Sequence, residues 1–369
     1  MRSSFISFVV LSALYNLVQG APSKRSSSCT GTISSLSDVT DAVECTTVNI
    51  NAFTVPAGET FSLSLLEGTT VNLNGNVAFG NVSWAGPLFE ISGTSITFNG
   101  NSNKFDGGGP FYWDGQGTNG GVTKPHPMMK IKISGTWTNV HVVNSPAQVY
   151  SVGNPAALTM SNLVIDNSQG NYPNSQSGGL PAGHNTDGFD ASTKNLVIEN
   201  STIMNQDDCI AINEGSNIVF SGNTCEGGHG ISIGSVTSNV VVSGIVIKGN
   251  TVINEMQAFR IKTDAAATNS TVTNITYSGN TATGIGSYGV LIDQSYPSTL
   301  GTPGNGVIIS DITFEDPTTT ITVNSTADKI AINCGSGSCT GTWNWNGLLV
   351  NGGDSGPVDG FAGISGYTQ

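Results

Sequence analysis

Short runs of alternating apolar and polar residues recur along most of the chain, and Asn, Gly or Ser bounds each run. Alternation with a period of two is typical of strands, whereas a helix needs apolar residues every three to four positions. The sequence therefore predicts many short strands joined by turns. The clearest predicted strands are Ser95–Phe98, Leu158–Ile165, Asn195–Ile198, Ile218–Phe220, Val240–Ile247, Ile275–Tyr277 and Val307–Phe314.

One phrase, an alternating apolar run that ends in Asn, repeats through the middle of the chain. It ends at Asn200, Asn223, Asn250 and Asn280, so the separations are 23, 27 and 30 residues. Such a period is typical of a solenoid with one coil per repeat. The runs are too short for amphipathic helices, propeller blades are longer, and sandwiches have no fixed repeat. We predict an all-β fold, a right-handed parallel β-helix with coils stacked about 4.8 Å apart.

Three acidic residues and a histidine follow the same coil spacing. Asp187, Asp208 and His229 are separated by 21 and 21 residues, and Asp207 adjoins Asp208. Residues at equivalent places in successive coils become neighbours, so we expect all four on one face. A lone Asp in a Gly/Asn-rich turn more often caps that turn. Three crowded carboxylates instead repel one another, which raises at least one pKa and is typical of a functional site.

Two cations are expected beside these acids. Arg260 and Lys262 follow about one coil after His229, and alternate residues of a strand point to the same side. Hydrolysis of a glycosidic bond needs one carboxyl that donates a proton and another that activates water, and a carboxylate trio supplies both. The two cations would hold the carboxylates of an acidic sugar.

These residues lie in four short motifs that keep their order at coil spacing. The motifs are NTDGFD at Asn185–Asp190, QDDC at Gln206–Cys209, GHG at Gly228–Gly230 and RIK at Arg260–Lys262. Together they resemble the polygalacturonases, family 28 of the glycoside hydrolases, and the phrase LPAGHNTDGFD is most similar to fungal endo-acting members. The resemblance implies an inverting endo-hydrolase that cleaves α-1,4 links between galacturonic acid units of homogalacturonan.

The resemblance also implies catalytic roles for four residues. Asp207 would be the general acid, and the crowding of like charges offers a reason for its proton. Asp187 and Asp208 would activate the attacking water. His229 would support the acid. No metal and no other cofactor is implied.

The substrate-binding residues implied by the family are Arg260, Lys262, Tyr296 and Asn185. Arg260 and Lys262 would bind a substrate carboxylate on the leaving side, and Tyr296 would pack against the sugar there. The segment before this tyrosine departs from the family, because Asp293 stands where a neutral amide is common. Polygalacturonate is the expected partner, and plant inhibitor proteins are a further one.

The beginning of the chain predicts an exported protein. Arg2 precedes an uncharged stretch from Phe5 to Val18, and small residues follow, which is typical of a secretory signal. We expect a signal peptide over residues 1–20, a short propeptide over 21–25 and a single catalytic domain over 26–369. No later segment has about eighteen consecutive apolar residues, so no membrane span is expected. The mature protein is expected to be an extracellular monomer.

An exported chain with 6 cysteines predicts three disulfides. Short separations favour the pairs Cys29–Cys45, Cys209–Cys225 and Cys334–Cys339, although spacing alone leaves other pairings open. Sequons for N-glycosylation occur at Asn81, Asn200, Asn269, Asn274 and Asn324.

Composition excludes some classes and leaves others open. A formal net charge of −13 argues against a nucleic-acid binder, which would show a basic face. Gly115, Gly117 and Gly120 fit a dinucleotide fingerprint, but no predicted strand or helix flanks them. Trp343 and Trp345 are expected to cover the last coil. The open alternatives are an exo-polygalacturonase, a rhamnogalacturonan or xylogalacturonan hydrolase, a calcium-dependent pectate lyase and an inactive pectin-binding decoy.

Overall fold

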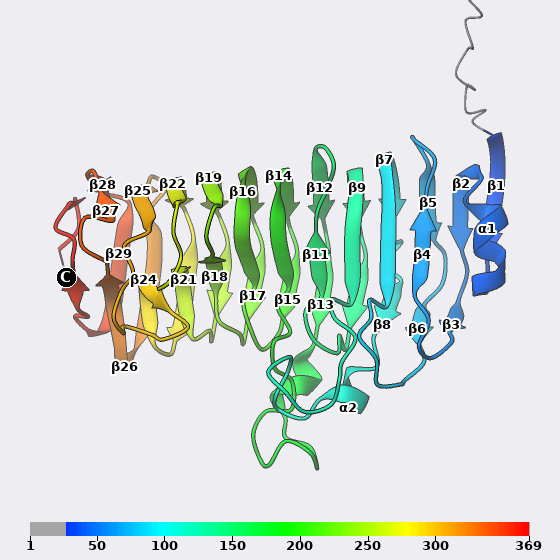
Figure 1. Cartoon of the computed structure of the whole chain (residues 1–369), viewed down its shortest axis with the longest axis horizontal. Helices are drawn as coiled ribbons and strands as arrows, with labels where there is room; N and C mark the ends of the chain where they lie inside the picture. The colour runs from blue at the N-terminus through cyan, green and yellow to red at the C-terminus, as the bar shows by residue number, and fades with distance from the viewer. Residues whose placement is uncertain (1–26, 369) are drawn as a thin grey trace, which may run out of the picture.

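The chain folds into one continuous stack of coils (Figure 1). The structure, a computed structural model, describes residues 27–368, so the expected signal peptide and propeptide lie outside the described residues. A typical coil has three strands, and each pairs in parallel with its counterpart in the next coil. Crossovers between parallel strands are right-handed. The fold is the right-handed parallel β-helix that the sequence repeat predicts.

The strands form three parallel faces, which we number 1 to 3. Face 1 contains β1 (Ser27–Ile33), β2 (Cys45–Ile50), β5 (Thr70–Leu73), β12 (Leu158–Ser161), β19 (Val241–Lys248), β22 (Ser270–Ser278), β25 (Val307–Glu315) and β27 (Cys339–Thr340). Face 2 contains β3 (Phe53–Val55), β6 (Val77–Phe79), β8 (Lys104–Asp106), β10 (His141–Val143), β13 (Val164–Asp166), β15 (Thr202–Met204), β17 (Thr224–Glu226), β20 (Thr251–Ile253), β23 (Thr281–Ile285) and β29 (Leu348–Asp354). Face 3 contains β4 (Phe61–Ser64), β11 (Tyr150–Val152), β18 (Ile231–Val236), β21 (Gln257–Asp264), β24 (Tyr288–Tyr296) and β30 (Val358–Asp359).

Long strands bend from one face into the next. Those that run from face 3 into face 1 are β7 (Phe89–Asn99), β9 (Met129–Thr138), β14 (Phe189–Glu199) and β16 (Ile210–Ser221). β26 (Thr319–Asn333) bends from face 2 into face 3. The predicted strands are confirmed in position. The predicted run Leu158–Ile165, however, is two strands, because the chain turns between β12 and β13 at Asn162, whose φ is 54°.

Short elements cover both ends of the solenoid. The 3₁₀ segment η1 (Leu36–Asp38) and helix α1 (Val39–Ala42) lie at the first coil, where Ala42 is buried. At the other end, β28 (Trp343–Asn344) pairs with β31 (Ile364–Ser365). The Trp343 and Trp345 side chains are fully buried there, as the sequence predicts for a cover of the last coil.

The core consists of stacked apolar side chains from successive coils. Inward positions alternate with outward ones, as in β14, where Phe189 and Ala191 are buried. Aromatic rings stack from coil to coil: Tyr150 lies over Phe189 with centroids 5.2 Å apart, and Tyr277 over Phe314 at 4.6 Å. Such pairs add attraction beyond the area they bury. The core thus repeats with each coil and holds the coils in register.

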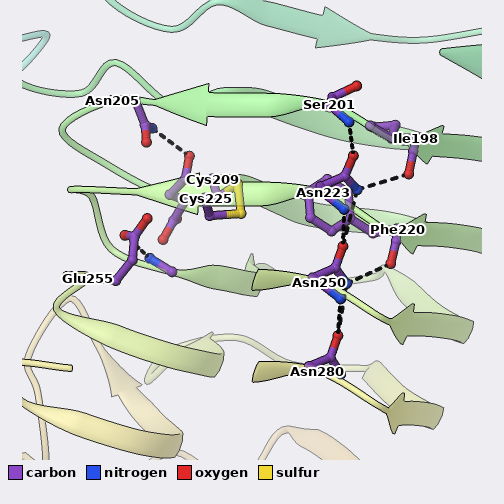
Figure 2. The surroundings of a disulfide bond; sticks show 12 residues. Ile198, Ser201, Asn205, Cys209, Phe220, Asn223, Cys225, Asn250, Glu255 and Asn280 are labelled. Atoms are coloured by element: carbon purple, nitrogen blue, oxygen red, sulfur yellow. Dashed lines mark hydrogen bonds between the residues drawn. A yellow bond between two sulfur atoms is a disulfide. The ribbon is translucent and has the colours of Figure 1, made fainter. Parts of the chain in front are cut away.

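A ladder of buried asparagines marks one turn of each middle coil (Figure 2). The Asn223 N–H donates to Asn250 Oδ1 at 2.9 Å, and the Asn250 N–H donates to Asn280 Oδ1 at 3.0 Å. Each Nδ2 also donates to a backbone carbonyl of the preceding coil. The structure corrects the repeat by one residue, since Ser201, not Asn200, is the ladder position before Asn223. Asn200 instead occupies a left-handed turn position with φ 53°.

The described cysteines form the three favoured disulfides. They pair Cys29 with Cys45, Cys209 with Cys225 and Cys334 with Cys339. The asparagine of each predicted sequon is exposed. Among the described residues, no helix combines the length and the apolar character needed to cross a membrane.

Two long connections project from one edge of the solenoid (Figure 1). The first follows β8 and includes helix α2 (Gly109–Tyr112), and the second follows β13 and includes η2 (Ser168–Asn171). They contact each other, because the Gly115 N–H donates to the Ala182 carbonyl and Asn174 Nδ2 donates to the Trp113 carbonyl. The pair forms a wall beside face 3.

Candidate active site

Strand register on face 3 stacks the acidic residues that the sequence singled out. Phe189 of β14 pairs with Ile210 of β16, which pairs with Ile231 of β18. The residues two positions before these three are Asp187, Asp208 and His229. They therefore occupy equivalent places in successive coils, at the turn that leads into face 3, as the 21-residue spacing predicts.

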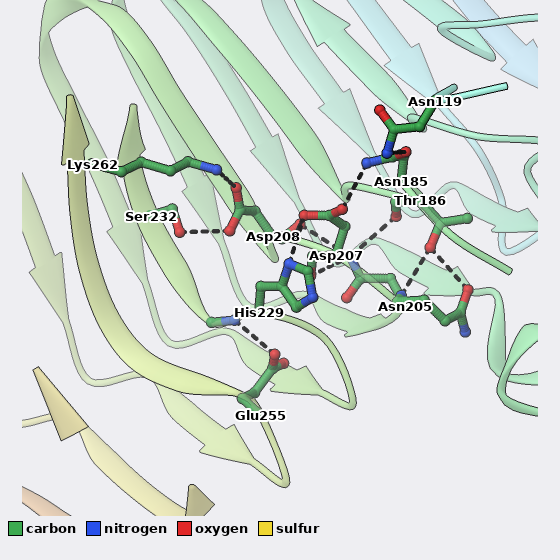
Figure 3. A network of polar contacts seen from close by, with 12 residues as sticks. Asn119, Asn185, Thr186, Asn205, Asp207, Asp208, His229, Ser232, Glu255 and Lys262 are labelled. Carbon is green, nitrogen blue, oxygen red and sulfur yellow. Dashed lines mark hydrogen bonds and ion pairs between the residues drawn. The ribbon is translucent and has the colours of Figure 1, made fainter. Parts of the chain in front are cut away.

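Asp207 lies in a network of hydrogen-bond donors (Figure 3). Its Oδ1 is 3.0 Å from His229 Nδ1 and accepts the Asp208 N–H at 2.8 Å. Its Oδ2 accepts from Asn185 Nδ2 at 2.9 Å. Asn185 is oriented in turn by Thr118 and Asn119, which donate to its Oδ1. The first projecting connection is thus linked to Asp207 by hydrogen bonds through the side-chain amide of Asn185.

Asp208 is fully buried and pairs with a cation from two coils further on. Its Oδ2 accepts from Lys262 Nζ at 2.6 Å, and its Oδ1 accepts from Ser232 Oγ at 2.6 Å. Burial lowers the Lys262 pKa, but the charge and hydrogen bond of Asp208 together with the charge of Asp207 outweigh it, and the Lys262 pKa is raised. Lys262 is therefore a permanent cation at the floor of the site.

Crowding of carboxylates raises the pKa of Asp187. Burial is the largest cause, and the charges of Asp207, Asp190 and Asp208 add to it, opposed by Lys262. For Asp190, burial and the charges of Asp208 and Asp207 raise the pKa to about 7. Burial and crowding therefore favour the protonated form of both carboxyls.

Asp207 behaves in the opposite way. Burial raises its pKa, but the hydrogen bond and charge of His229, followed by Lys262 and the Asp208 N–H, lower it to about 2. Burial lowers the His229 pKa, but Asp207 outweighs burial, and the His229 pKa is raised. The expectation that crowding by itself puts the proton on Asp207 is wrong for this structure. The proton of this pair resides on the imidazole.

The expected substrate-binding cations meet one aromatic ring. Arg260 and Lys262 lie on β21 two residues apart, and the Tyr296 ring at the end of β24 is 5.9 Å from Arg260 Cζ and 5.3 Å from Lys262 Nζ. A cation over a ring face is attracted by the ring quadrupole. Tyr296 therefore gathers both cations on one side of the three acids.

The acids, the cations, Tyr296, Asn185 and His229 all line one hollow of about 400 Å³. A second hollow of about 720 Å³ adjoins it and shares His184 and His229. Four buried polar atoms of residues that line the first hollow have no hydrogen-bond partner among the described residues: Gln148 Oε1, His184 Nδ1, Asp187 Oδ1 and Arg260 Nε. Because proteins rarely leave such atoms unpaired, they are suited to bind a polar ligand.

One cluster at the site has the donor atoms for a metal ion. Ligand-type atoms of Asp207, Asp208 and His229 lie within 4.8 Å of one another. Protein donors already engage these groups, since His229 faces Asp207 while Lys262 and Ser232 donate to Asp208. A cation would have to displace the Lys262 ammonium or the imidazole proton. The donor set therefore fits a metal poorly, and the expected absence of a metal stays a prediction.

Sequence reasoning missed three residues of the site. Asp190 lies within the first motif and lines the hollow, and Ser232 hydrogen-bonds Asp208. Glu255 lies behind His229 and accepts from the Gly230 N–H. Strand alternation after each motif could have found Asp190 and Ser232. Glu255 carries no such signal, because it lies in a turn of variable length.

The acid that departs from the family, Asp293, does not line either hollow. It is buried and accepts from Ser295, Asn333 and the Leu300 N–H. These bonds fold the segment after β24. Asp293 therefore shapes the loop next to Tyr296.

Comparisons with known proteins agree with this geometry. The model of the glycosyl hydrolases family 28 matches residues 45–359. An endo-polygalacturonase of Sclerotinia sclerotiorum is 42% identical over 90% of this chain and 86% of its own length. A probable endopolygalacturonase A of Neosartorya fischeri is also 42% identical, over 96% of both chains.

Solved structures show the same relationship. Endopolygalacturonase I from Stereum purpureum, complexed with two galacturonate, superposes with a TM-score of 0.84 at 47% identity, over 89% of this chain and 96% of that chain. A polygalacturonase from Erwinia carotovora shares the fold, with a TM-score of 0.63 at 20% identity over 95% and 99% of the two chains. The family model matches most of the β-helix, and the predicted site residues meet at the turn into face 3. The chain therefore belongs to family 28 of the glycosyl hydrolases.

Proposed function

We propose that the chain is a secreted endo-polygalacturonase that hydrolyses the α-1,4 links of homogalacturonan with inversion. One observation carries the proposal. Four aspartates and His229 share a hollow with two cations that lie against Tyr296. Catalytic carboxylates and anion-binding groups are the requirements for cleaving an acidic polysaccharide. The names of the fungal relatives support the same substrate.

The general acid in this proposal is Asp207 acting together with His229. Their Oδ1 and Nδ1 atoms are 3.0 Å apart, and the pair holds one proton while the imidazole is charged. A bound substrate adds negative carboxylates and an oxygen that gains charge as its bond breaks. Both favour transfer of the proton to Asp207 and on to that leaving oxygen.

Asp208 and Asp187 act on the attacking water. The carboxylate of Asp208 has a spare lone pair on each oxygen after accepting from Lys262 and Ser232. It takes one proton from the water as the water oxygen bonds to the anomeric carbon. Asp187, which keeps its own proton at acidic pH, orients the water through its unpartnered Oδ1. Inversion follows from the family resemblance and is tested by NMR of the first anomer released.

Substrate carboxylates bind at Arg260 and Lys262, and Tyr296 packs against the same sugar. Arg supplies a planar fork of donors and Lys a point charge. Asn185 reaches the sugar from the side of the projecting connections. The chain as a whole is acidic, so these two cations localise an acidic polymer at the one place where it is cut. We further propose a monomer that acts outside the cell, where plant inhibitor proteins are candidate partners.

The decisive experiment is a time course on polygalacturonate with purified protein. We expect new reducing ends without ultraviolet absorbance from an unsaturated product, and no loss of rate with a chelator. Early mid-length oligomers indicate endo action, whereas monomer alone indicates an exo-enzyme. Unsaturated products indicate a lyase, and turnover confined to xylogalacturonan or rhamnogalacturonan contradicts the substrate assignment. Binding without turnover would establish the inactive decoy.

The acid is tested by Asp207→Asn, which cannot donate the required proton. We expect turnover to fall roughly 10²- to 10⁴-fold, the contribution typical of general acid catalysis, with an unchanged circular dichroism spectrum. Asp41→Asn, at an exposed position in α1, is the matched control and should stay fully active. An active Asp207→Asn enzyme would refute the acid role.

A further inference from the structure

The turn that carries His229 has few side chains to hold it. Its neighbours are Gly228 and Gly230, and a Cβ at either would overlap a backbone carbonyl, that of Asp207 or of Gln257. The turn is therefore packed backbone against backbone between adjacent coils. Its position depends on where its own N–H and C=O groups find partners.

Glu255, in the turn before β21, supplies a side-chain acceptor for this turn (Figure 3). Its Oε2 accepts the Gly230 N–H at 2.7 Å, and its carboxyl also accepts from the Gly228 N–H. The N–H of His229 donates to the Asp207 carbonyl at 2.8 Å. The carboxyl of Glu255, which comes from the next coil, thus accepts a hydrogen bond that a backbone carbonyl accepts between other adjacent coils.

Glu255 is itself held rigidly and is shielded from solvent. Its side chain is 2% exposed, and its carbonyl accepts the Gly286 N–H at 2.9 Å. Its Oε1 has no hydrogen-bond partner among the described residues. The mechanism proposed above does not use this carboxyl.

The charge of Glu255 follows from its surroundings. Burial is the largest cause that raises its pKa to about 8, and the charges of Asp208 and Asp207 add to this, against the N–H groups of Gly230 and Gly228. The titratable groups that face it are these two acids and His229. Glu255 is therefore a neutral carboxylic acid in mildly acidic surroundings, and its Oε2 is the acceptor.

We propose that Glu255 is the positioning residue for His229: its carboxyl clamps the GHG turn so that the imidazole stays paired with Asp207. This proposal rests on the proposed function only for the consequence in turnover. The pairing at 3.0 Å is what keeps the imidazole protonated beyond its ordinary range. A turn that lost the clamp would let the imidazole move away, and the proton of the acid pair would be lost at lower pH.

The test compares Glu255→Gln with Glu255→Leu. Gln keeps an acceptor oxygen and places a donor where the acid has its hydroxyl, so it should retain turnover within about 3-fold. Leu fills the space without an acceptor. We expect kcat to fall roughly 10- to 100-fold with little change in KM, the scale of a small misplacement of a catalytic group. Glu226→Gln, at an exposed glutamate of β17, is the control.

A second readout does not depend on substrate. The chain has 4 histidines, so NMR can follow each imidazole in the free protein, with His229→Ala to identify the signal. We expect the His229 pKa to fall toward its ordinary value in Glu255→Leu and to stay raised in Glu255→Gln. The alkaline limb of the pH profile of kcat should shift together with this pKa.

Each outcome decides the question. A Leu variant with unchanged kcat and an unchanged His229 pKa overturns the proposal, and so does a Gln variant that has lost both. If the Leu variant does not fold, the Gln variant still decides through its His229 pKa. A lowered melting temperature with an unmoved pKa would show a purely structural carboxyl. If polygalacturonate is not cleaved at all, the NMR titration tests the clamp independently of the function.

Discussion

At the residue scale, neighbouring carboxyls of one site take different protonation states because their partners differ. Asp207 faces three donors and its pKa is lowered, while Asp187 and Asp190 face mainly other acids and their pKa values are raised. Burial acts on all of them in the same direction. The donors, and His229 above all, therefore decide which carboxyl is charged.

The first prediction concerns pH and His229. Its folded pKa is raised, so the imidazolium persists above the ordinary pKa of about 6.5 and is lost as pH rises through the folded value. We expect kcat to decline on the alkaline side with the same midpoint as the His229 NMR titration. His229→Ala should remove that limb and lower kcat at every pH. Two midpoints that differ by more than a pH unit would contradict a shared acid pair.

The second prediction concerns Lys262. Replacing it by Met keeps the aliphatic stem but removes the charge that pairs with Asp208 and that we propose binds a substrate carboxylate. A charged hydrogen bond is worth about 1.5–3 kcal/mol, so kcat/KM should fall roughly 10- to 100-fold, with a clear rise in KM. The control is Lys248→Met, at an exposed position of β19. An unchanged KM on polygalacturonate would be incompatible with substrate binding by Lys262.

At the element scale, the turns rather than the strands set the position of the site. The motif residues lie just before strands of face 3, where three successive coils place them in line. On the opposite turn, the asparagine ladder fixes the stacking of the same coils. Errors in stacking there would change the spacing of Asp187, Asp208 and His229, because these residues lie in neighbouring coils of the same stack.

A substitution in the ladder tests this role. Asn250→Ala removes side-chain bonds to Phe220, Asn223 and Asn280 and leaves a buried N–H without its acceptor. We expect the free energy of unfolding to fall by about 2–4 kcal/mol, because each orphaned buried group costs about 1–3 kcal/mol. Chemical denaturation measures this, with Asn305→Ala, at an exposed position, as the control. A loss below about 0.5 kcal/mol would show that the strands alone hold the stack.

At the scale of the whole molecule, the buried acids make stability depend on pH. Asp187, Asp190, Glu255 and His229 all have raised folded pKa values. A group whose folded pKa is raised contributes stability that is complete below its unfolded pKa and is lost as pH rises through the folded value. The lowered pKa of Asp207 acts in the opposite direction, but only below about pH 4.

We therefore expect the melting temperature to fall as pH rises from about 4 to about 8. Each unit of pKa shift corresponds to about 1.4 kcal/mol, so several such groups make the fall measurable by scanning calorimetry. Asp190→Asn should make the melting temperature depend less on pH near pH 7, because an amide has no acidic proton to lose there. A melting temperature that rises across this interval would contradict these protonation states.

The sequence by itself determined the fold and singled out eight residues that line one hollow, but it missed Asp190, Ser232 and Glu255. Alternation of period two and a repeat near one coil length left few architectures other than a parallel β-helix, and 21-residue steps placed Asp187, Asp208 and His229 in one line. Such inferences succeed because a solenoid converts sequence spacing directly into adjacency. The prediction that Asn200 belongs to the repeat is wrong by one residue, because Ser201 occupies the ladder position before Asn223. Sequence spacing alone did not distinguish these two neighbouring positions.

Only the tertiary structure decided which carboxyl is charged and what holds the histidine. The sequence predicts crowded acids, but the pKa of Asp207 depends on groups from other coils, above all His229 and then Lys262. Glu255 reached the site from a turn with no recognisable spacing. The physical reason is that electrostatic energies depend on burial and on distances of a few ångströms, which a repeat of twenty to thirty residues does not specify.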